Sequence, residues 1–142
     1  MFDDLYNTDI LTLSASLKNE RLENPQGTAR KVSKLCGSWL EIDVNLQDGK
    51  VADCALRVQA CALGQASAAI LKAAIIGATL EEVRKARNAL MAILKAEGPP
   101  PEGRFKKLAL LQGVKDYPAR HVSTALAFEA AVDAIEMALE HA

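Results

Sequence analysis

The stretch Trp39-Leu40-Glu41-Ile42-Asp43-Val44-Asn45-Leu46 decides the fold class of this chain. Its even positions are all apolar and most of its odd positions are polar, which is the two-residue period of a half-buried β-strand. Asp48-Gly49 follows at once and indicates a tight hairpin turn, because glycine accepts the positive φ that such turns require. The returning residues, Lys50 to about Val58, alternate more weakly. We therefore expect an antiparallel hairpin with one face, that of Glu41 and Asp43, exposed to water.

The segments on either side of this hairpin predict one further strand and several helices. In chain order we expect a helix over Asp3 to Lys18, a short strand around Ala29 to Ser33, a buried helix over Ala62 to Ile76, a capped helix from Thr79, a short helix around Arg104 to Leu111 and a last helix from Pro118. The predicted fold class is α+β, one domain over residues 1–142: a small three-stranded antiparallel sheet with helices packed on one face.

Composition excludes several classes of function. The 142 residues carry 17 Lys and Arg against 18 Asp and Glu, so the net charge is −1 and general binding to nucleic acid is not expected. Half of the chain is hydrophobic (50%), yet no apolar run approaches the roughly 20 residues of a membrane span. We therefore expect a cytoplasmic protein that binds neither nucleic acid nor a membrane.

The three cysteines are too few, and odd in number, for a disulfide framework. Cys36 lies just before the central strand and Cys61 lies where the buried helix begins, a position at which the helix dipole favours thiolate. A hairpin returns the chain to the edge where it started, so both thiols are expected at one end of the sheet. The alternative is that they are merely buried, as free cysteines often are. For Cys54, in mid-strand, strand packing is the prediction.

Several short motifs occur in a specific order, and together they resemble the IscU/NifU-like family of iron–sulfur cluster scaffolds. They are Asn24-Pro25-x-Gly27, Cys36-Gly37, Asp48-Gly49, Cys61 with the small-residue run Gly64-Gln65-Ala66-Ser67-Ala68-Ala69, and Pro118-Ala119-Arg120-x-x-Ser123. The resemblance extends over about residues 22 to 136. It implies the same α+β fold and a scaffold without catalytic turnover of its own.

The sequence departs from the family pattern at the third cysteine, which is Ser123 here, and at the aspartate after Cys-Gly, which is Ser38. Some members carry a histidine just before the third cysteine, whereas this chain has His121 one residue earlier. A serine hydroxyl is a much poorer ligand for iron or zinc than a thiolate. The resemblance therefore implies cluster binding by Cys36 and Cys61, with His121 and Ser123 as further candidate metal ligands.

The family implies a cysteine desulfurase as sulfur donor and iron–sulfur acceptor proteins as recipients. Because a 2Fe–2S cluster usually has four thiolates, two chains with two cysteines each would complete one in a homodimer. Three alternatives remain. One is a single Zn or Fe ion on Cys36, Cys61, His121 and a nearby carboxylate or water. Another is a metal-free module that binds the desulfurase, and the third is a thiol enzyme with Cys61 as nucleophile. The last is disfavoured because no glycine-rich oxyanion loop is evident.

Overall fold

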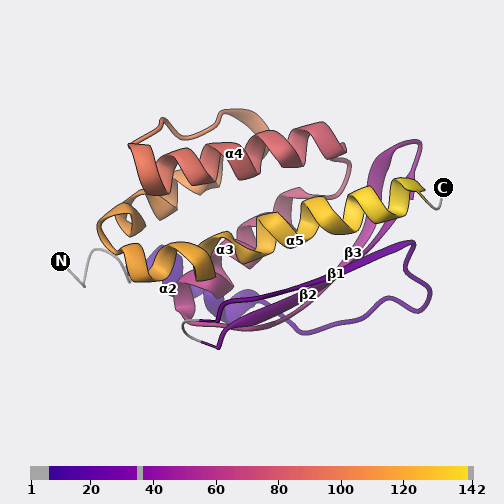
Figure 1. The fold of residues 1–142 in the computed structure, drawn as a ribbon, viewed down its shortest axis with the longest axis horizontal. Helices are drawn as coiled ribbons and strands as arrows, with labels where there is room; N and C mark the ends of the chain where they lie inside the picture. The colour runs from indigo at the N-terminus through magenta and orange to yellow at the C-terminus, as the bar shows by residue number, and fades with distance from the viewer. Residues whose placement is uncertain (1–6, 35–36, 141–142) are drawn as a thin grey trace.

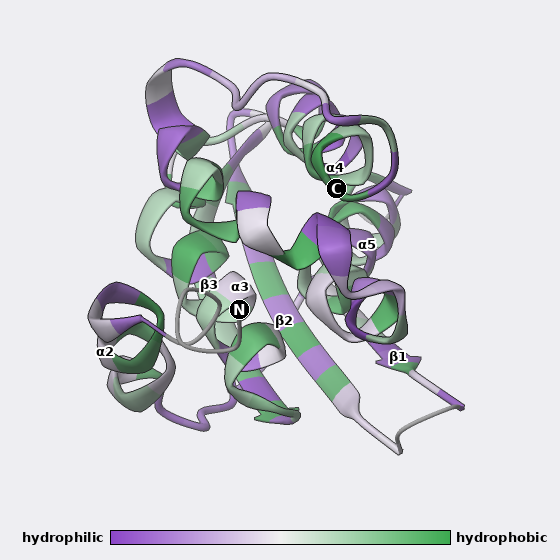
Figure 2. Ribbon diagram, turned by 90° about the vertical axis from the view of Figure 1, so that its left-hand side faces the viewer, coloured by the Kyte–Doolittle hydropathy of each residue, from purple (hydrophilic) through white to green (hydrophobic). Residues whose placement is uncertain are grey.

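The three-stranded sheet forms as the hairpin sequence predicts. The computed structural model describes residues 7–34 and 37–140, with strands β1 (Gly27–Val32), β2 (Trp39–Gln47) and β3 (Lys50–Gln59) in the order β1-β2-β3, all antiparallel. Hydrophobic and hydrophilic residues alternate along β2 (Figure 2). Asp48 and Gly49 join β2 to β3 with φ values of 55° and 76°, so the turn lies at the predicted dipeptide.

The helices cover one face of this sheet and confirm the α+β prediction (Figure 1). They are α2 (Thr8–Ser16), α3 (Ala62–Ala74), α4 (Leu80–Ala96) and α5 (His121–Glu140), with two 3₁₀ segments, η1 (Gly103–Asp116) and η2 (Pro118–Arg120), between α4 and α5. Helix α5 packs on β1 and β2, α3 packs on β3, and α4 lies outside α5. In the described residues, no helix is long and apolar enough to cross a membrane.

Two helices differ from the sequence prediction. The N-terminal helix begins at Thr8, because the Asn7 side chain accepts a hydrogen bond from the Ile10 N–H at 3.0 Å and caps it there. The expected first turn at residues 3 and 4 lies outside the described residues. The helix expected near Arg104 is 3₁₀ rather than α, and it is longer than predicted. The capping box at Thr79 starts α4 as predicted.

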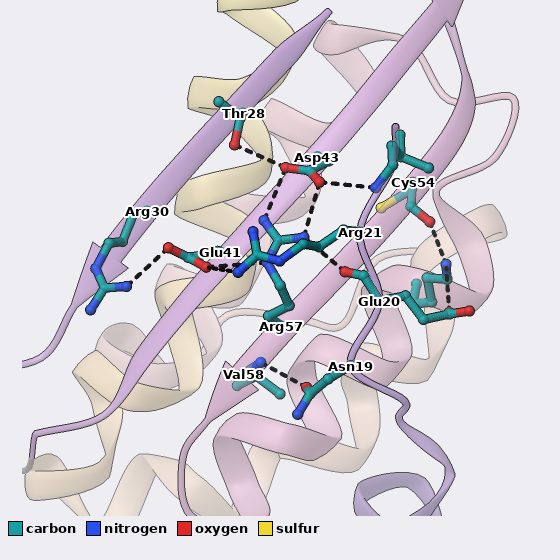
Figure 3. A network of polar contacts seen from close by, with 12 residues as sticks. Asn19, Glu20, Arg21, Thr28, Arg30, Glu41, Asp43, Cys54, Arg57 and Val58 are labelled. Atoms are coloured by element: carbon teal, nitrogen blue, oxygen red, sulfur yellow. Dashed lines mark hydrogen bonds and ion pairs between the residues drawn. The ribbon is translucent and has the colours of Figure 1, made fainter. Parts of the chain in front are cut away.

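The outer face of the sheet is not simply exposed to water, which corrects the sequence prediction. The connecting segment, residues 17–26 between α2 and β1, crosses this face and covers a buried ion pair (Figure 3). Asp43 is 4% exposed, and its two carboxylate oxygens accept hydrogen bonds from Arg57 at 2.9 and 3.0 Å. The Leu22 N–H donates to Asp43 at 3.1 Å, and Arg57 donates to the Glu20 carbonyl at 2.7 Å. A strand period shows which face a residue takes, but it does not show what covers that face.

Small residues allow α5 to lie directly on the sheet. A Cβ added at Gly27 would lie 1.9 Å from the carbonyl oxygen of Ala134 and 2.9 Å from the backbone nitrogen of Ala138. No side chain other than hydrogen therefore fits where β1 crosses α5. This close approach fixes α5 along the sheet and so fixes the position of its first turn, which carries Ser123.

Candidate functional site

Cys61 lies at the N-terminus of α3, as its position in the sequence predicts. It is the N-cap residue, with extended backbone (φ −66°, ψ 171°), and its carbonyl accepts the hydrogen bond from the Gln65 N–H at 3.0 Å. The thiol is half-buried and does not cap the helix itself. The unpaired N–H groups of the first turn and the helix dipole favour an anionic group beside this residue.

Ser123 meets Cys61 although 62 residues separate them. The Cys61 Sγ and the Ser123 Oγ lie 3.3 Å apart, within hydrogen-bonding distance for sulfur, and Ser123 is only 2% exposed. Gly64 permits this approach: a Cβ there would lie 2.8 Å from the Ala60 Cβ and 3.1 Å from the Ser123 Oγ. The first turns of α3 and α5 therefore bring two residues of the predicted site into contact.

The residues that follow Cys36 reach the same place. Gly37, Ser38, Gln59, Ala60, Cys61 and Arg120 line a hollow in the surface, which we call the Cys61 hollow. The loop is held by hydrogen bonds from the Ser33 N–H to the Ser38 carbonyl (2.8 Å) and from the Gly37 N–H to the Ser33 carbonyl (2.9 Å). Cys36 itself lies outside the described residues, so its side chain is not placed. The topology nevertheless brings its neighbours Gly37 and Ser38 beside Cys61.

The Cys61 hollow has a positive electrostatic character. Arg120, in the turn before α5, is its one charged lining residue within the described part of the chain, and the N-terminus of α3 opens beside it. Anions are favoured next to a helix N-terminus and a guanidinium. A thiolate or a sulfide-containing cluster fits this environment better than a cation without anionic ligands.

His121 takes a different orientation from the one expected of a metal ligand. Its Nε2 lies 3.1 Å from the carbonyl oxygens of both Val114 and Lys115, which are the last turn of η1. This nitrogen therefore acts as the donor, and Nδ1 is the atom left to accept or to bind a metal. In the described ranges, His121 does not line the Cys61 hollow, and no three Cys, His, Asp or Glu side chains form a group that could hold a metal ion.

Cys54 packs in the core, as its mid-strand position predicts. It is 6% exposed and pairs with Val44 across the sheet on the face that α3 and α5 cover. Burial raises the pKa of the Cys54 thiol to about 12, and the nearby Lys72 ammonium only partly offsets this rise. Cys54 is therefore a neutral thiol at physiological pH and does not belong to the site.

The sequence analysis missed two lining residues, Gln59 and Ala60. Their only signal was their position directly before Cys61, at the end of the returning strand. The last residues of a strand lie close to the N-terminus of the helix that follows them, so this position could have identified both residues.

Comparisons with known proteins agree with this geometry. The family described as NifU-like N terminal domain matches residues 6–124. The iron–sulfur cluster assembly scaffold protein IscU of Thermotoga maritima is 26% identical over 137 residues, which are 96% of each chain. The crystal structure of a nitrogen-fixing NifU-like protein (N-terminal) from Brucella abortus superposes with a TM-score of 0.95 at 44% identity, over 99% of both chains.

A more distant structure shares the fold alone. It is a putative iron–sulfur cluster assembly scaffold protein for the SUF system from Fervidobacterium islandicum, with a TM-score of 0.84 at 21% identity, covering 94% of this chain and 98% of that one. The matched family region contains Cys36, Cys61 and Ser123, the residues on which the motif resemblance rested. This chain belongs to the NifU-like N-terminal domain family, the family of IscU-like iron–sulfur cluster assembly scaffolds.

Proposed function

We propose that this protein is an iron–sulfur cluster scaffold or carrier that holds iron and sulfide on the thiolates of Cys36 and Cys61. The observation that carries the proposal is the Cys61 hollow: Cys61 lies at a helix N-terminus, 3.3 Å from Ser123, beside the residues that follow Cys36. Its positive character suits a cluster whose thiolate and sulfide ligands are anionic. The cluster is the cargo of the protein, received with sulfur from a cysteine desulfurase and passed to acceptor proteins.

We further propose that two copies of the chain share one 2Fe–2S cluster. Such a cluster usually takes four thiolates, whereas the site of one chain offers Cys36 and Cys61 and the weak hydroxyl ligand of Ser123. Cys54 cannot supply another thiolate because it is buried in the core. A second copy contributes two more thiolates without any change of fold, so loading with cluster should be accompanied by dimer formation.

The test compares two cysteine variants after anaerobic reconstitution with iron and sulfide. We expect Cys61→Ser to lose most of the iron, the acid-labile sulfide and the visible charge-transfer absorption that the wild type gains. Cys54→Ala, which also removes one thiol but from the core, is the matched control and should retain them. Equal metal and sulfide contents in the wild type and Cys61→Ser would refute the site.

The same measurement identifies the rival mononuclear function. It would use Cys36 and Cys61 with His121 or Ser123 as further ligands, and His121 would bind through Nδ1 because its Nε2 already faces two carbonyls. Near-stoichiometric zinc without sulfide in the protein as purified would replace the cluster proposal with this one. Iron and sulfide in a ratio near one, with a shift to dimer, is the outcome that supports the cluster.

A further inference from the structure

The two edges of the sheet differ in whether their outward backbone groups have hydrogen-bond partners. Along β3, the backbone groups that point away from β2 are paired with the connecting segment and with α3 (Figure 3). The contacts join the Lys72 ammonium to the Cys54 carbonyl, the Glu20 N–H to the Leu56 carbonyl at 2.8 Å, and the Val58 N–H to the Asn19 Oδ1 at 3.0 Å. Edge closure of this kind prevents another strand from pairing at β3.

The β1 edge is left open next to the loop that carries Cys36. The Ser33 N–H donates to the Ser38 carbonyl, so the alternation of an antiparallel ladder turns the backbone groups of Val32, Arg30 and Thr28 away from β2. The Thr28 N–H lies 3.5 Å from the sulfur of Met137. In the described residues, the outward backbone groups of Arg30 and Val32 meet no partner. Figure 2 shows β1 at the side of the molecule opposite α2.

An apolar surface adjoins this open edge. Val32 is 50% exposed and pairs directly with Trp39 on the outer face of the sheet. The Arg30 guanidinium lies 4.9 Å from the centre of the Trp39 ring and holds that ring in place. The connecting segment passes over Asp43 toward the hairpin end, so it does not cover this pair.

On the outer face of the sheet the charge beside the edge is positive, whereas on the helix face Lys31 pairs with Asp133 at 2.9 Å and Glu129 lies near it. Glu41 accepts contacts from three guanidiniums, those of Arg57 at 3.1 Å, Arg30 at 3.0 Å and Arg21 at 3.6 Å. Asp43 is the other carboxylate that these guanidiniums contact, so three cations face two anions (Figure 3). The side chains of Arg21 and Arg30 are 70% and 53% exposed, so the surplus charge is available to a partner.

A second copy of the chain is a poor occupant of this edge. Antiparallel pairing of two β1 strands centred on Arg30 would place the two Arg30 side chains opposite each other, and centring on Lys31 would do the same with Lys31. Like charges directly opposite in a sheet are destabilising. A strand that places its carboxylates on the outer face, beside Arg30 and away from Asp133 and Glu129, meets no such repulsion.

We propose that the β1 edge binds an extended acidic segment of a partner protein by strand addition. Main-chain hydrogen bonds to Arg30 and Val32 would give affinity, an apolar side chain of the partner would lie on Val32 and Trp39, and a carboxylate beside Arg30 would give specificity. A segment bound at Val32 would lie near Gly37 and Ser38, which line the Cys61 hollow, and so lead the partner to that hollow. This interaction needs neither thiol nor metal, and it goes beyond the proposed scaffold function.

The test uses Trp39, the only tryptophan of the chain, as the reporter. The probe is a synthetic eight-residue peptide, Thr-Val-Thr-Glu-Thr-Val-Thr-Glu, blocked at both ends and titrated into the full chain. Its Val and Glu side chains share one face of an extended strand, as Arg30 and Val32 do. We expect a saturable change in Trp39 emission that weakens with added salt. Two further peptides are N-methylated at every odd or every even residue. Strand addition predicts at least a tenfold loss of affinity for one of the two and little change for the other, and equal binding of both would overturn it.

Charge reversal locates the peptide on the molecule. We expect Arg30→Glu and Val32→Glu to weaken peptide binding at least tenfold, whereas Lys50→Glu, exposed at the far end of the sheet, should leave it unchanged. Arg30→Gln, which removes the charge without placing a second acid beside Glu41, should bind at an intermediate level and shows that the loss is not unfolding.

The remaining outcomes separate this proposal from its rivals. An equal loss of peptide affinity in Lys50→Glu would show that the net charge of the protein, and not the β1 edge, controls binding. That result would overturn the proposed site. A dimer of the metal-free protein that Val32→Glu abolishes would assign the edge to a second copy instead. The Cys61→Ser variant should bind the peptide like the wild type, so failure of the cluster site and failure of the β1 edge are told apart.

Discussion

At the scale of single residues, the proposed cluster site depends most on Ser123. It occupies the place of a third cysteine in the family pattern, buried and 3.3 Å from the Cys61 sulfur, with Gly64 keeping the space between α3 and α5 small. A ligand atom at this position would therefore lie against Cys61. What differs is the atom, because a neutral hydroxyl binds iron far less well than a thiolate.

We therefore expect Ser123→Cys to change the stoichiometry of the cluster. With a third thiolate in place, a single chain needs fewer thiolate ligands from a second copy. The reconstituted protein should therefore shift from dimer to monomer. Sedimentation monitored at the cluster absorbance measures this shift. Ser123→Ala, which adds no ligand, is the control and should remain dimeric when loaded. A Ser123→Cys protein that stays dimeric with the wild-type spectrum contradicts the prediction.

At the scale of elements, the connecting segment is fixed to the sheet by one buried ion pair. Asp43 and Arg57 have side chains only 5% and 8% exposed, and each also binds the backbone of the segment. Removing one partner of a buried pair typically costs about 3–5 kcal/mol, because the other charge stays buried without compensation. Glu41, which also binds Arg57, reduces the cost here.

Asp43→Asn should consequently loosen the segment and destabilise the protein by a few kcal/mol, roughly the lower part of that range. Hydrogen exchange should accelerate first at the Glu20 and Leu22 amides, which bind the edge of β3 and Asp43. Asp53→Asn makes the same substitution at an exposed position of β3 and should change stability by less than about 0.5 kcal/mol. Uniform acceleration across the whole chain would show that the pair does not act through the segment.

At the scale of the whole molecule, stability depends on pH through carboxylates that are hydrogen-bonded only in the folded chain. Hydrogen bonds from Arg57, and then from Arg30, hold the pKa of Glu41 below its ordinary value. Burial would raise the pKa of Asp43, but the hydrogen bonds from Arg57, Leu22 and Thr28 together outweigh burial and lower it. The backbone N–H of Thr79 lowers the pKa of Glu82.

Groups with a lowered folded pKa contribute stability that is present above their unfolded pKa of about 4 and is lost as pH falls through the folded value. The free energy of unfolding, measured by urea titration, should therefore change little from pH 7 to about pH 5 and fall steeply below about pH 4. The slope should be smaller in Asp43→Asn, which lacks one of these groups. A profile that is flat down to pH 3 would contradict this assignment.

The sequence by itself determined the sheet, the hairpin turn and the family. These predictions rest on local features: the two-residue period of Trp39 to Leu46, the Asp48-Gly49 turn and the order of the motifs. Local features can be recognised in the sequence without knowing how the rest of the chain packs. They also separated Cys54 from Cys61, because one lies in mid-strand and the other at a helix start.

Only the tertiary structure decided what covers each surface and which distant residues meet. The connecting segment buries Asp43 and closes the β3 edge, the contact of Cys61 with Ser123 depends on how α5 lies against α3, and His121 turns to the end of η1. These contacts join residues from 6 to 62 positions apart. A local period records which side chains can share a face, whereas burial and contact depend on the packing of the elements.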